Sequence, residues 1–454
     1  MKLVIRSEYP NLMTAAIADH SFQSALAVPT VRRLDNGLTI IAQQTPTDAV
    51  NLNLWFRVGS AVESDSINGM AHFLEHMLFK GTDHLPQGEF ERRIEARGGV
   101  ANAATSQDYT HFYFTSAPQD FAALAPLQIE LVLNPRLAIS DFERERSVIL
   151  EEIARAHDNP RRRIFARSMA MTFDRLPYRR SVLGTAAVVK SLTAQQMRDF
   201  HHYWYQPERI TAVAVGNLPE EELIQTVAAG FEQALARRQR VDESRNPATQ
   251  VCRSAPEAPF ATIQRHSFTD AALQQARLVL SWRVPGLTDV EQTNALDVLT
   301  SILARGRLSR LVRDLREQQQ LVTSIAASNM SYWQQGVFTI AASLPTENIE
   351  TVEAAIVDHV QRVQTDPVAL AELQRVQTQV ANRYVFDSES PSDLAGLYGY
   401  YQTLTGQLQP ALHYPNEIQR LTPADIQMAA QIYLSTQAYG ALHILPTAAP
   451  STIS

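Results

Sequence analysis

The chain has 454 residues, of which 45% are hydrophobic and 19% are charged, and its formal net charge is −7. This length exceeds what one ordinary hydrophobic core supports, so we expect two globular domains of about 200 residues each. The composition excludes fibrous and disordered proteins, and a small acidic surplus without a polybasic segment argues against nucleic-acid binding.

The cysteine count excludes disulfides and thiolate zinc clusters, and the length of the apolar runs excludes a membrane span. Cys252 is the one cysteine, so the chain can form neither an intramolecular disulfide nor a zinc cluster of thiolates. No apolar run reaches the roughly 18 residues that a membrane-spanning helix needs, so we expect no membrane span.

Residues 1–29 precede the first strand pattern. Lys2 and Arg6 stand before a weakly apolar stretch, as in a signal peptide, but Glu8 and Asp19 interrupt that stretch. We interpret the segment as a flexible N-terminal extension, with a signal peptide as the alternative, and we expect a cytoplasmic protein.

The first half then alternates strand and helix patterns. Residues 38–42 and 51–58 carry the branched and aromatic side chains of strands, and we expect them to be antiparallel neighbours. Helical patterns and strand patterns follow in alternation. The expected helices are 69–80, 141–156 and 193–205, and the expected strands are 110–115 and 210–216.

The second half repeats this order. LTAQQMRDFHHYWYQPERITAVAVGNLP from Leu192 is similar to LTPADIQMAAQIYLSTQAYGALHILPTA from Leu421, and FRVGS from Phe56 is similar to WRVPG from Trp282. The offsets, 421 − 192 = 229 and 282 − 56 = 226, nearly agree. A near-constant offset indicates that one α+β unit has been duplicated.

We therefore predict an α+β fold of two homologous domains, each a mostly antiparallel β-sheet packed with helices. The N-terminal domain spans 30–236, and the C-terminal repeat spans 268–454. The segment 237–267, with prolines among polar residues, is the expected linker. The alternative is a long surface loop inside a single domain.

The segment GMAHFLEHML, residues 69–78, carries the strongest chemical signal. At 3.6 residues per turn, His72, Glu75 and His76 share one helix face. Two imidazoles one turn apart can hold a zinc ion, and the carboxylate between them can act on a nearby water molecule. The motif alone arises by chance in roughly two chains per hundred, so a pair of core histidines beside an exposed glutamate is the alternative.

Zinc also needs a third protein ligand and supporting groups. The helix expected at 141–156 contains FERERSVILEE, which offers Glu145, Glu151 and Glu152. Glu151 and Glu152 lie about 100° apart around the helix, so only one of them can face the two histidines.

The order His-x-x-Glu-His, followed about 75 residues later by a glutamate, resembles the pitrilysin or inverzincin zinc metallopeptidases, in particular their two-domain members. In that family the third ligand closes a run of Glu, six residues, Glu, which Glu145 and Glu152 match. The resemblance implies that His72, His76 and Glu152 bind Zn2+, that Glu75 is the catalytic base, and that Glu145 supports the ligands.

The resemblance covers nearly the whole chain. GGVANAATSQDYTHFYF from Gly98 is similar to the edge strand with which the family pairs an extended substrate, so Asn102 and Ala103 are expected to hold the peptide. An exposed strand edge binds a peptide backbone with little choice of side chain. Without the resemblance, an ordinary hairpin is the alternative for this stretch.

The second half departs from the motif. Superposing the repeats places Leu296, Leu299 and Thr300 against His72, Glu75 and His76, which predicts a metal-free domain, as in the family. The family's second half instead supplies an Arg and, seven residues later, a Tyr, which bind the carbonyl region of the substrate and stabilise the oxyanion. Arg316 occupies the first position, but Thr323 replaces the tyrosine, and a threonine hydroxyl cannot reach as far as a phenol.

Two-domain members of the family assemble one site across two subunits. Thr323 therefore favours a heterodimer in which a sister subunit supplies the Arg/Tyr pair, with a homodimer as the alternative. We predict a zinc metalloendopeptidase that processes extended peptides or unfolded segments. The alternative function is a non-catalytic peptide-binding or scaffold subunit of a larger processing complex.

Overall fold

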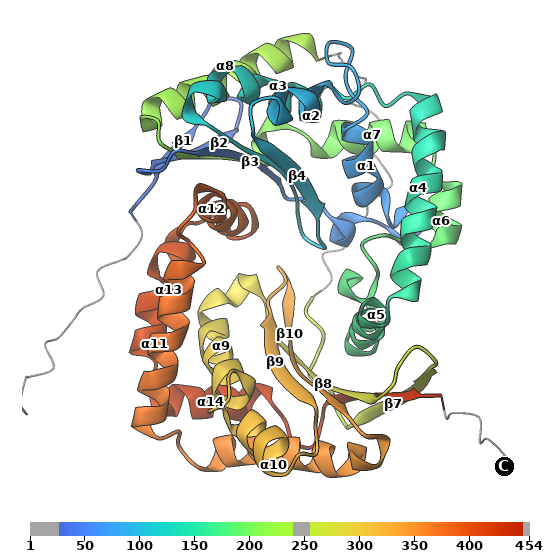
Figure 1. The fold of residues 1–454 in the computed structure, drawn as a ribbon, viewed down its shortest axis with the longest axis vertical. Helices are drawn as coiled ribbons and strands as arrows, with labels where there is room; N and C mark the ends of the chain where they lie inside the picture. The colour runs from blue at the N-terminus through green and yellow to red at the C-terminus, as the bar shows by residue number, and fades with distance from the viewer. Residues whose placement is uncertain (1–26, 239–254, 448–454) are drawn as a thin grey trace, which may run out of the picture.

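The structure, a computed structural model, describes residues 27–238 and 255–447. It contains a six-stranded and a five-stranded β-sheet, each packed with helices, and the two halves face one another (Figure 1). This arrangement confirms the predicted α+β fold. Residues 1–26 of the predicted extension and 239–254 of the predicted linker, including Cys252, lie outside the described residues.

The first half is built on a sheet of order β1-β2-β6-β3-β5-β4. Its strands are β1 Thr30–Arg33, β2 Thr39–Gln44, β3 Val50–Phe56, β4 Val100–Thr105, β5 Thr110–Ser116 and β6 Ile210–Gly216. Its helices are α1 Met70–Leu78, α2 Glu89–Glu95, α3 Phe121–Leu133, α4 Ile139–Asp158, α5 Pro160–Thr172, α6 Ala186–Ser191, α7 Ala194–Trp204 and α8 Glu220–Arg237.

One predicted pairing was wrong. The strands expected at 38–42 and 51–58 are β2 and β3, and they are not neighbours, because β6 lies between them, parallel to β2 and antiparallel to β3. The reason is burial. Every residue of β6, ITAVAVG, is buried, so this apolar strand stabilises the sheet most in a central position, covered on both faces.

The second half repeats this sheet without the first strand, in the order β7-β11-β8-β10-β9. β7 and β11 are parallel, as β2 and β6 are, and the remaining pairs are antiparallel. The strands are β7 Gln264–Asp270, β8 Ala276–Pro285, β9 Ser324–Met330, β10 Gln335–Leu344 and β11 Gly440–Pro446. The helices are α9 Val290–Ala304, α10 Ile349–Thr365, α11 Leu370–Phe386, α12 Pro391–Thr405, α13 Gln409–Arg420 and α14 Pro423–Tyr433. None of the helices in the described ranges is long and apolar enough to cross a membrane.

One helix of each half packs against the β-sheet of the other half. Helix α12 of the second half packs on β3 and β6 of the first, where Tyr398 joins an apolar cluster with Trp55 and Val213. Gly399 permits this approach, because a Cβ there would lie 2.1 Å from Trp55 Nε1. Helix α5 of the first half packs on β8 and β11 of the second in the same way, through Met171. The apolar inner faces of both sheets are therefore covered across the boundary between the halves.

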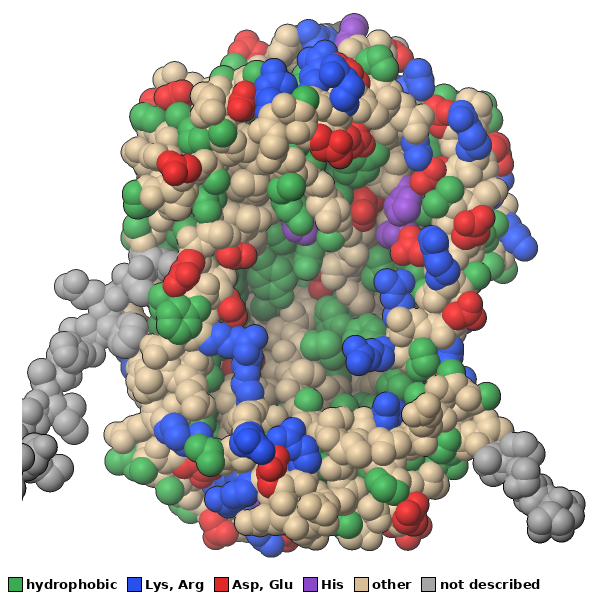
Figure 2. Space-filling view, in the orientation of Figure 1, with side chains coloured by type: hydrophobic (Ala, Val, Ile, Leu, Met, Phe, Trp, Pro, Cys, Tyr) green, Lys and Arg blue, Asp and Glu red, His purple; other side chains and the backbone are tan. Residues whose placement is uncertain are grey.

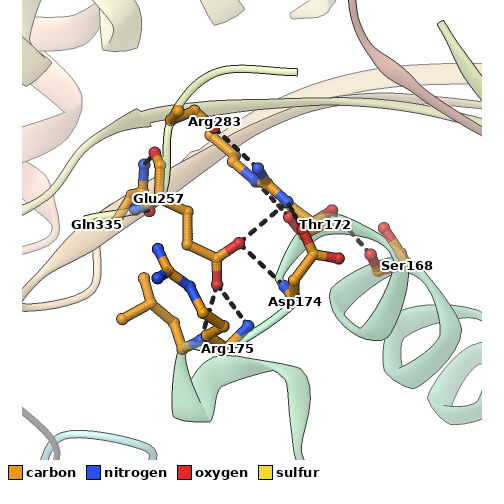
Figure 3. A network of polar contacts seen from close by, with 9 residues as sticks. Ser168, Thr172, Asp174, Arg175, Glu257, Arg283 and Gln335 are labelled. Atoms are coloured by element: carbon orange, nitrogen blue, oxygen red, sulfur yellow. Dashed lines mark hydrogen bonds and ion pairs between the residues drawn. The ribbon is translucent and has the colours of Figure 1, made fainter. Parts of the chain in front are cut away.

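A buried carboxylate also joins the halves. Glu257 accepts hydrogen bonds from the backbone N–H groups of residues 174–176, at 2.7 to 2.9 Å, at the end of α5 (Figure 3). Its backbone exchanges two hydrogen bonds with the Gln335 side chain of β10, each 2.8 Å long. Arg283 of β8 lies 3.0 Å from the carboxylate and donates to the carbonyl of Thr172 at 2.6 Å. These contacts connect the first half to the second.

We expect the substitution Glu257→Gln to destabilise the protein. It removes the charge that Arg283 neutralises and replaces an acceptor with an amide donor facing backbone N–H groups. Loss of one member of a buried, hydrogen-bonded charge pair lowers the free energy of unfolding by about 2 to 4 kcal/mol. Urea unfolding followed by circular dichroism measures the change. The exposed Glu389→Gln is the matched control, and equal midpoints for the two variants would contradict the assignment.

Candidate metal centre

Helix α1 presents two different faces. Met70, Phe73, Leu74, Met77 and Leu78 are buried in the core of the first half, so the remaining face carries the polar motif residues. The N-terminus of the helix is held by the buried carboxylate of residue 63, a glutamate, which accepts from the backbone N–H groups of residues 69 and 71 at 2.8 and 2.7 Å. This carboxylate satisfies donors that a helix start leaves free.

The structure brings His72, His76 and Glu152 together. Their potential ligand atoms all lie within 4.8 Å of one another. Oε2 of Glu152 is 3.6 Å from Nε2 of each histidine. Ligand atoms of a tetrahedral zinc ion lie about 3.3 Å apart, given zinc distances of about 2.0 to 2.1 Å. The three side chains therefore fit a zinc ion, and helices α1 and α4 supply them.

Glu145 supports this group from α4. Its Oε1 lies 2.9 Å from Nδ1 of His76, and its Oε2 lies 2.6 Å from Nζ of Lys80. Burial would raise the pKa of Glu145, but the contacts with Lys80 and His76 lower it more. A carboxylate can only accept, so Nδ1 carries the proton and Nε2 keeps its lone pair for a metal.

His72 is the more buried of the two histidines. Burial, with smaller effects from His76 and Arg162, lowers the pKa of His72 to about 3. Its Nδ1 has no hydrogen-bond partner among the described residues. The imidazole is therefore neutral over the physiological range, which is the form that ligates metals.

Glu75 lies beside the group without belonging to it. Thr105, at the end of β4, donates a hydrogen bond of 2.5 Å to Oε2 of Glu75, and Thr110 of β5 donates to the Thr105 hydroxyl at 3.2 Å. Burial raises the pKa of Glu75. Thr105 and Lys80 were not predicted from the sequence, because their contacts depend on how β4 and α4 pack against α1.

Strand β4 lies at the free edge of the first sheet, as expected for this segment. Within it Asn102 pairs with Tyr113 and Ala103 pairs with Phe112 of β5. Asn102 is exposed, and its Oδ1 accepts a hydrogen bond from the backbone N–H of Ala103 at 2.9 Å. Since Thr105 contacts Glu75, this open edge runs directly to the metal group.

The structure does not bring Arg316 and Thr323 to this group. Arg316 lies on the π-helical turn Val312–Gln318 and pairs with Glu317, at 2.9 and 2.5 Å. The Thr323 hydroxyl donates to Oε1 of Gln275 at 2.8 Å. No hydrogen bond or ion pair within the described ranges joins either residue to the histidines of α1.

The repeat register differs by one residue from the sequence superposition. Gly81 and Gly306 follow α1 and α9, with φ of +90° and +80°, and they stand 306 − 81 = 225 residues apart. The same offset places every buried apolar residue of α1 on a buried apolar residue of α9. The counterparts of His72, Glu75 and His76 are therefore residues 297, 300 and 301, namely Asp, Thr and Ser.

Known proteins are similar over most of this chain. Residues 38–186 match the family model for insulinase (peptidase family M16), and residues 191–380 match the model for the peptidase M16 inactive domain. An uncharacterized zinc protease of Mycobacterium tuberculosis is 28% identical over 424 residues, which cover 93% of this chain and 94% of that relative.

Solved structures have the same fold. A protease from Helicobacter pylori superposes with a TM-score of 0.83 at 24% identity, over 92% of this chain and 99% of that chain. A chain of complex III2 from Candida albicans superposes with a TM-score of 0.75 at 14% identity, over 92% of this chain and 96% of that chain. At these identities the likeness shows the fold alone.

We expect the chain to bind one zinc ion, and Glu152→Gln to lower the affinity at least a hundredfold by removing a charged ligand. Glu145→Gln should lower it about 10- to 100-fold, because the His76 ring loses its partner. Competition with a chromophoric chelator measures both. The neighbouring Glu151→Gln is the control, since Glu151 is exposed and points elsewhere. Loss of zinc by the Glu151→Gln variant, together with retention of zinc by the Glu152→Gln variant, would show that Glu151 and not Glu152 is the third ligand.

Proposed function

The chain belongs to peptidase family M16, the insulinase family, and on that premise we propose that it is a zinc-dependent endopeptidase that hydrolyses extended peptides. One observation carries the proposal. A glutamate that is not part of the His-His-Glu group, Glu75, is held beside it and beside an open strand edge. Relatives of similar length are named zinc proteases, which supports peptidase activity at the level of the family.

His72, His76 and Glu152 hold the metal in this proposal. A bound zinc ion supplies a Lewis acid that polarises the scissile carbonyl and acidifies water. Glu75 takes a proton from the attacking water and delivers it to the nitrogen of the leaving amine. Thr105 orients Glu75 through Oε2, so that Oε1 is the oxygen available for the proton. Burial favours the protonated form between the two transfers.

The peptide is proposed to bind along β4. The backbone groups of its free edge can add an extended peptide as a further strand, which positions its carbonyls beside Glu75. The Asn102 side chain occupies the Ala103 N–H in the free protein and can exchange this contact for the substrate backbone. Backbone pairing of this kind favours unfolded segments over folded ones, because only an extended chain offers its hydrogen-bonding groups.

The site is proposed to be completed by another subunit. Thr323 stands where the family's second half carries a tyrosine, and its hydroxyl is engaged with Gln275. A heterodimer with a sister chain that has both Arg and Tyr would supply the missing donor for the oxygen that becomes negative during hydrolysis. A homodimer, which would have to work without this donor, is the alternative.

Thr323 also favours a second function. The chain superposes on a component of complex III2 from Candida albicans, and residues 191–380 match a domain described as inactive. A peptide-binding or scaffold subunit would need no oxyanion donor, which fits Thr323. It would also need no group such as His72, His76 and Glu152, whose close approach supports the catalytic proposal instead.

We expect Glu75→Gln to abolish hydrolysis, lowering kcat by at least about a thousandfold, while zinc binding stays unchanged, because the amide cannot accept the proton from water. Cleavage of an internally quenched peptide gives kcat, and the chelator competition gives the metal content. Glu95→Gln, at the exposed end of α2, is the control and should leave both unchanged. Residual turnover at the wild-type rate would exclude Glu75 as the base.

We expect the purified chain alone to be a slow peptidase, and Thr323→Tyr to raise kcat/KM about tenfold in a homodimer, because the phenol of one copy can then donate to the developing oxyanion at the site of the other. The same peptide assay measures this change. Thr346→Tyr, on an exposed turn of the same half, is the control for added aromatic surface. A wild-type chain that is already fast, and no faster with Tyr at 323, would remove the need for a sister subunit.

A further inference from the structure

A pocket in the second half is lined by four arginines. It has a volume of about 380 Å³ and lies between the end of α9 and the middle of α11. Arg305 and Arg307 follow α9, and Arg375 and Arg383 project from α11. None of the residues that line the pocket is acidic, so the charge needs an explanation.

Carboxylates neutralise only part of this charge. Arg307 pairs with Glu317 at 3.3 Å, and Arg383 pairs with Asp387 at 3.1 Å, and both arginine side chains are more than half exposed. Exposed pairs of this kind are weak and exchange readily. Arg375 makes no ion pair or hydrogen bond with the described part of the chain. Partial burial, and then the nearby charge of Arg383, lower the pKa of Arg305 more than the carboxylates of Asp387 and Asp297 raise it. The guanidinium groups therefore repel one another in the free protein.

The floor of the pocket carries an unused polar atom. Ser301 is 4% exposed, and its hydroxyl oxygen has no hydrogen-bond partner among the described residues. A buried hydroxyl without a partner is destabilising, and a ligand that accepts its hydrogen bond would remove that penalty. Ser301 lines the pocket together with the arginines. The hydroxyl and the guanidinium groups are all donors, so they select the same kind of ligand.

Helix dipoles do not explain the whole cluster. Arg305 and Arg307 stand at the C-terminus of α9, where free carbonyl groups favour cations. Arg375 lies in the second turn of α11, and its backbone neighbours there are engaged in the helix. Arg375 therefore gains nothing from a helix end, whereas Arg383 stands in the last turn of α11.

In the internal repeat, this pocket occupies the position in the second half that corresponds to the metal group in the first half. By the offset of 225 residues, Ser301 is the counterpart of His76 and Arg305 is the counterpart of Lys80. In α4 and α11 the buried pairs Phe142 and Leu373, and Ile149 and Val380, stand 231 residues apart, which makes Arg383 the counterpart of Glu152. The second half thus has cationic groups and a hydroxyl where the first half has metal ligands.

The surface agrees with this placement. Figure 2 shows a hollow between the halves, with His side chains on its upper right margin and Lys and Arg side chains gathered on its lower left margin. The lower left is the region that α9 and α11 occupy in Figure 1. A peptide lying across the hollow could therefore reach both margins.

We propose that this pocket binds a carboxylate of the peptide substrate, either an acidic side chain or the C-terminal carboxylate. Guanidinium groups bind carboxylates through paired, charge-assisted hydrogen bonds, and the Ser301 hydroxyl adds a donor at the floor. The identity of the ligand as a substrate rests on the proposed peptidase function. The pocket binds a part of the peptide that is distant from the scissile bond. It therefore adds a preference for acidic peptides, which backbone pairing along β4 does not provide.

The test measures peptide binding without hydrolysis. A fluorescein-labelled ten-residue peptide ending in three glutamates is compared with the same peptide ending in three glutamines, by fluorescence anisotropy in EDTA. We expect the wild-type chain to bind the glutamate peptide about tenfold more tightly. Arg375→Gln and Arg383→Gln should each reduce this preference to about twofold or less. Arg93→Gln, on an exposed face of α2, should leave it unchanged.

The outcomes separate the possible ligands. Amidated versions of both peptides show whether the side chains or the terminal carboxylate is bound, and either result supports the proposal. Equal binding of the two peptides by the wild-type chain would overturn it, and so would a preference that survives both arginine substitutions. Displacement of the glutamate peptide by micromolar inorganic phosphate would also overturn it, because the pocket would then be a site for a free anion. Since EDTA removes the metal, a failure of the peptidase proposal appears separately, as absent hydrolysis.

Discussion

The packing of α1 against α4 is the constraint on which the site depends. The rings of Phe73 and Phe142 stack with centroids 4.6 Å apart, and both are fully buried. Each ring lies next to or one turn from a polar residue of the site, His72 on α1 and Glu145 on α4. The apolar contact therefore sets the distance between the polar faces of the two helices. Glu145, which also contacts Lys80, then holds the His76 imidazole in its orientation. Hydrophobic burial provides the free energy, and the carboxylate provides the orientation.

Much of the fold and the face of α1 that carries the two histidines could be predicted from the sequence, because they follow local periodicity. The spacing of His72, Glu75 and His76 placed them on one helix face. The angle of about 100° between Glu151 and Glu152 meant that only one of them could face the histidines, and the resemblance to the family selected Glu152. Strand and helix patterns located three helices and four strands of the first half within a few residues. The repeat of LTAQQMRDF in LTPADIQMA predicted a second sheet, which the order β7-β11-β8-β10-β9 confirms.

The rest depends on contacts between segments far apart in the chain. Nothing in residues 38–58 indicates that a strand from residue 210 lies between β2 and β3. Thr105 and Lys80 reach the site only because β4 and α4 pack against α1. The superposition of the repeats missed the register by one residue, because it had no landmark near α9. The paired glycines at positive φ, Gly81 and Gly306, supply one. With this register, the second half shows donors where the first shows metal ligands.

The exchange of α5 and α12 bears on how the chain could have arisen. A single ancestral unit would expose one apolar sheet face, and a second copy would cover that face with its own helix while receiving the same cover in return. Two separate copies could have formed this arrangement as a symmetric pair before fusion joined them in one polypeptide. Fusion then allowed the two copies to diverge in charge without losing their mutual support. In a pair of identical subunits every substitution occurs in both copies. Arginines could therefore accumulate in the second copy alone only after fusion.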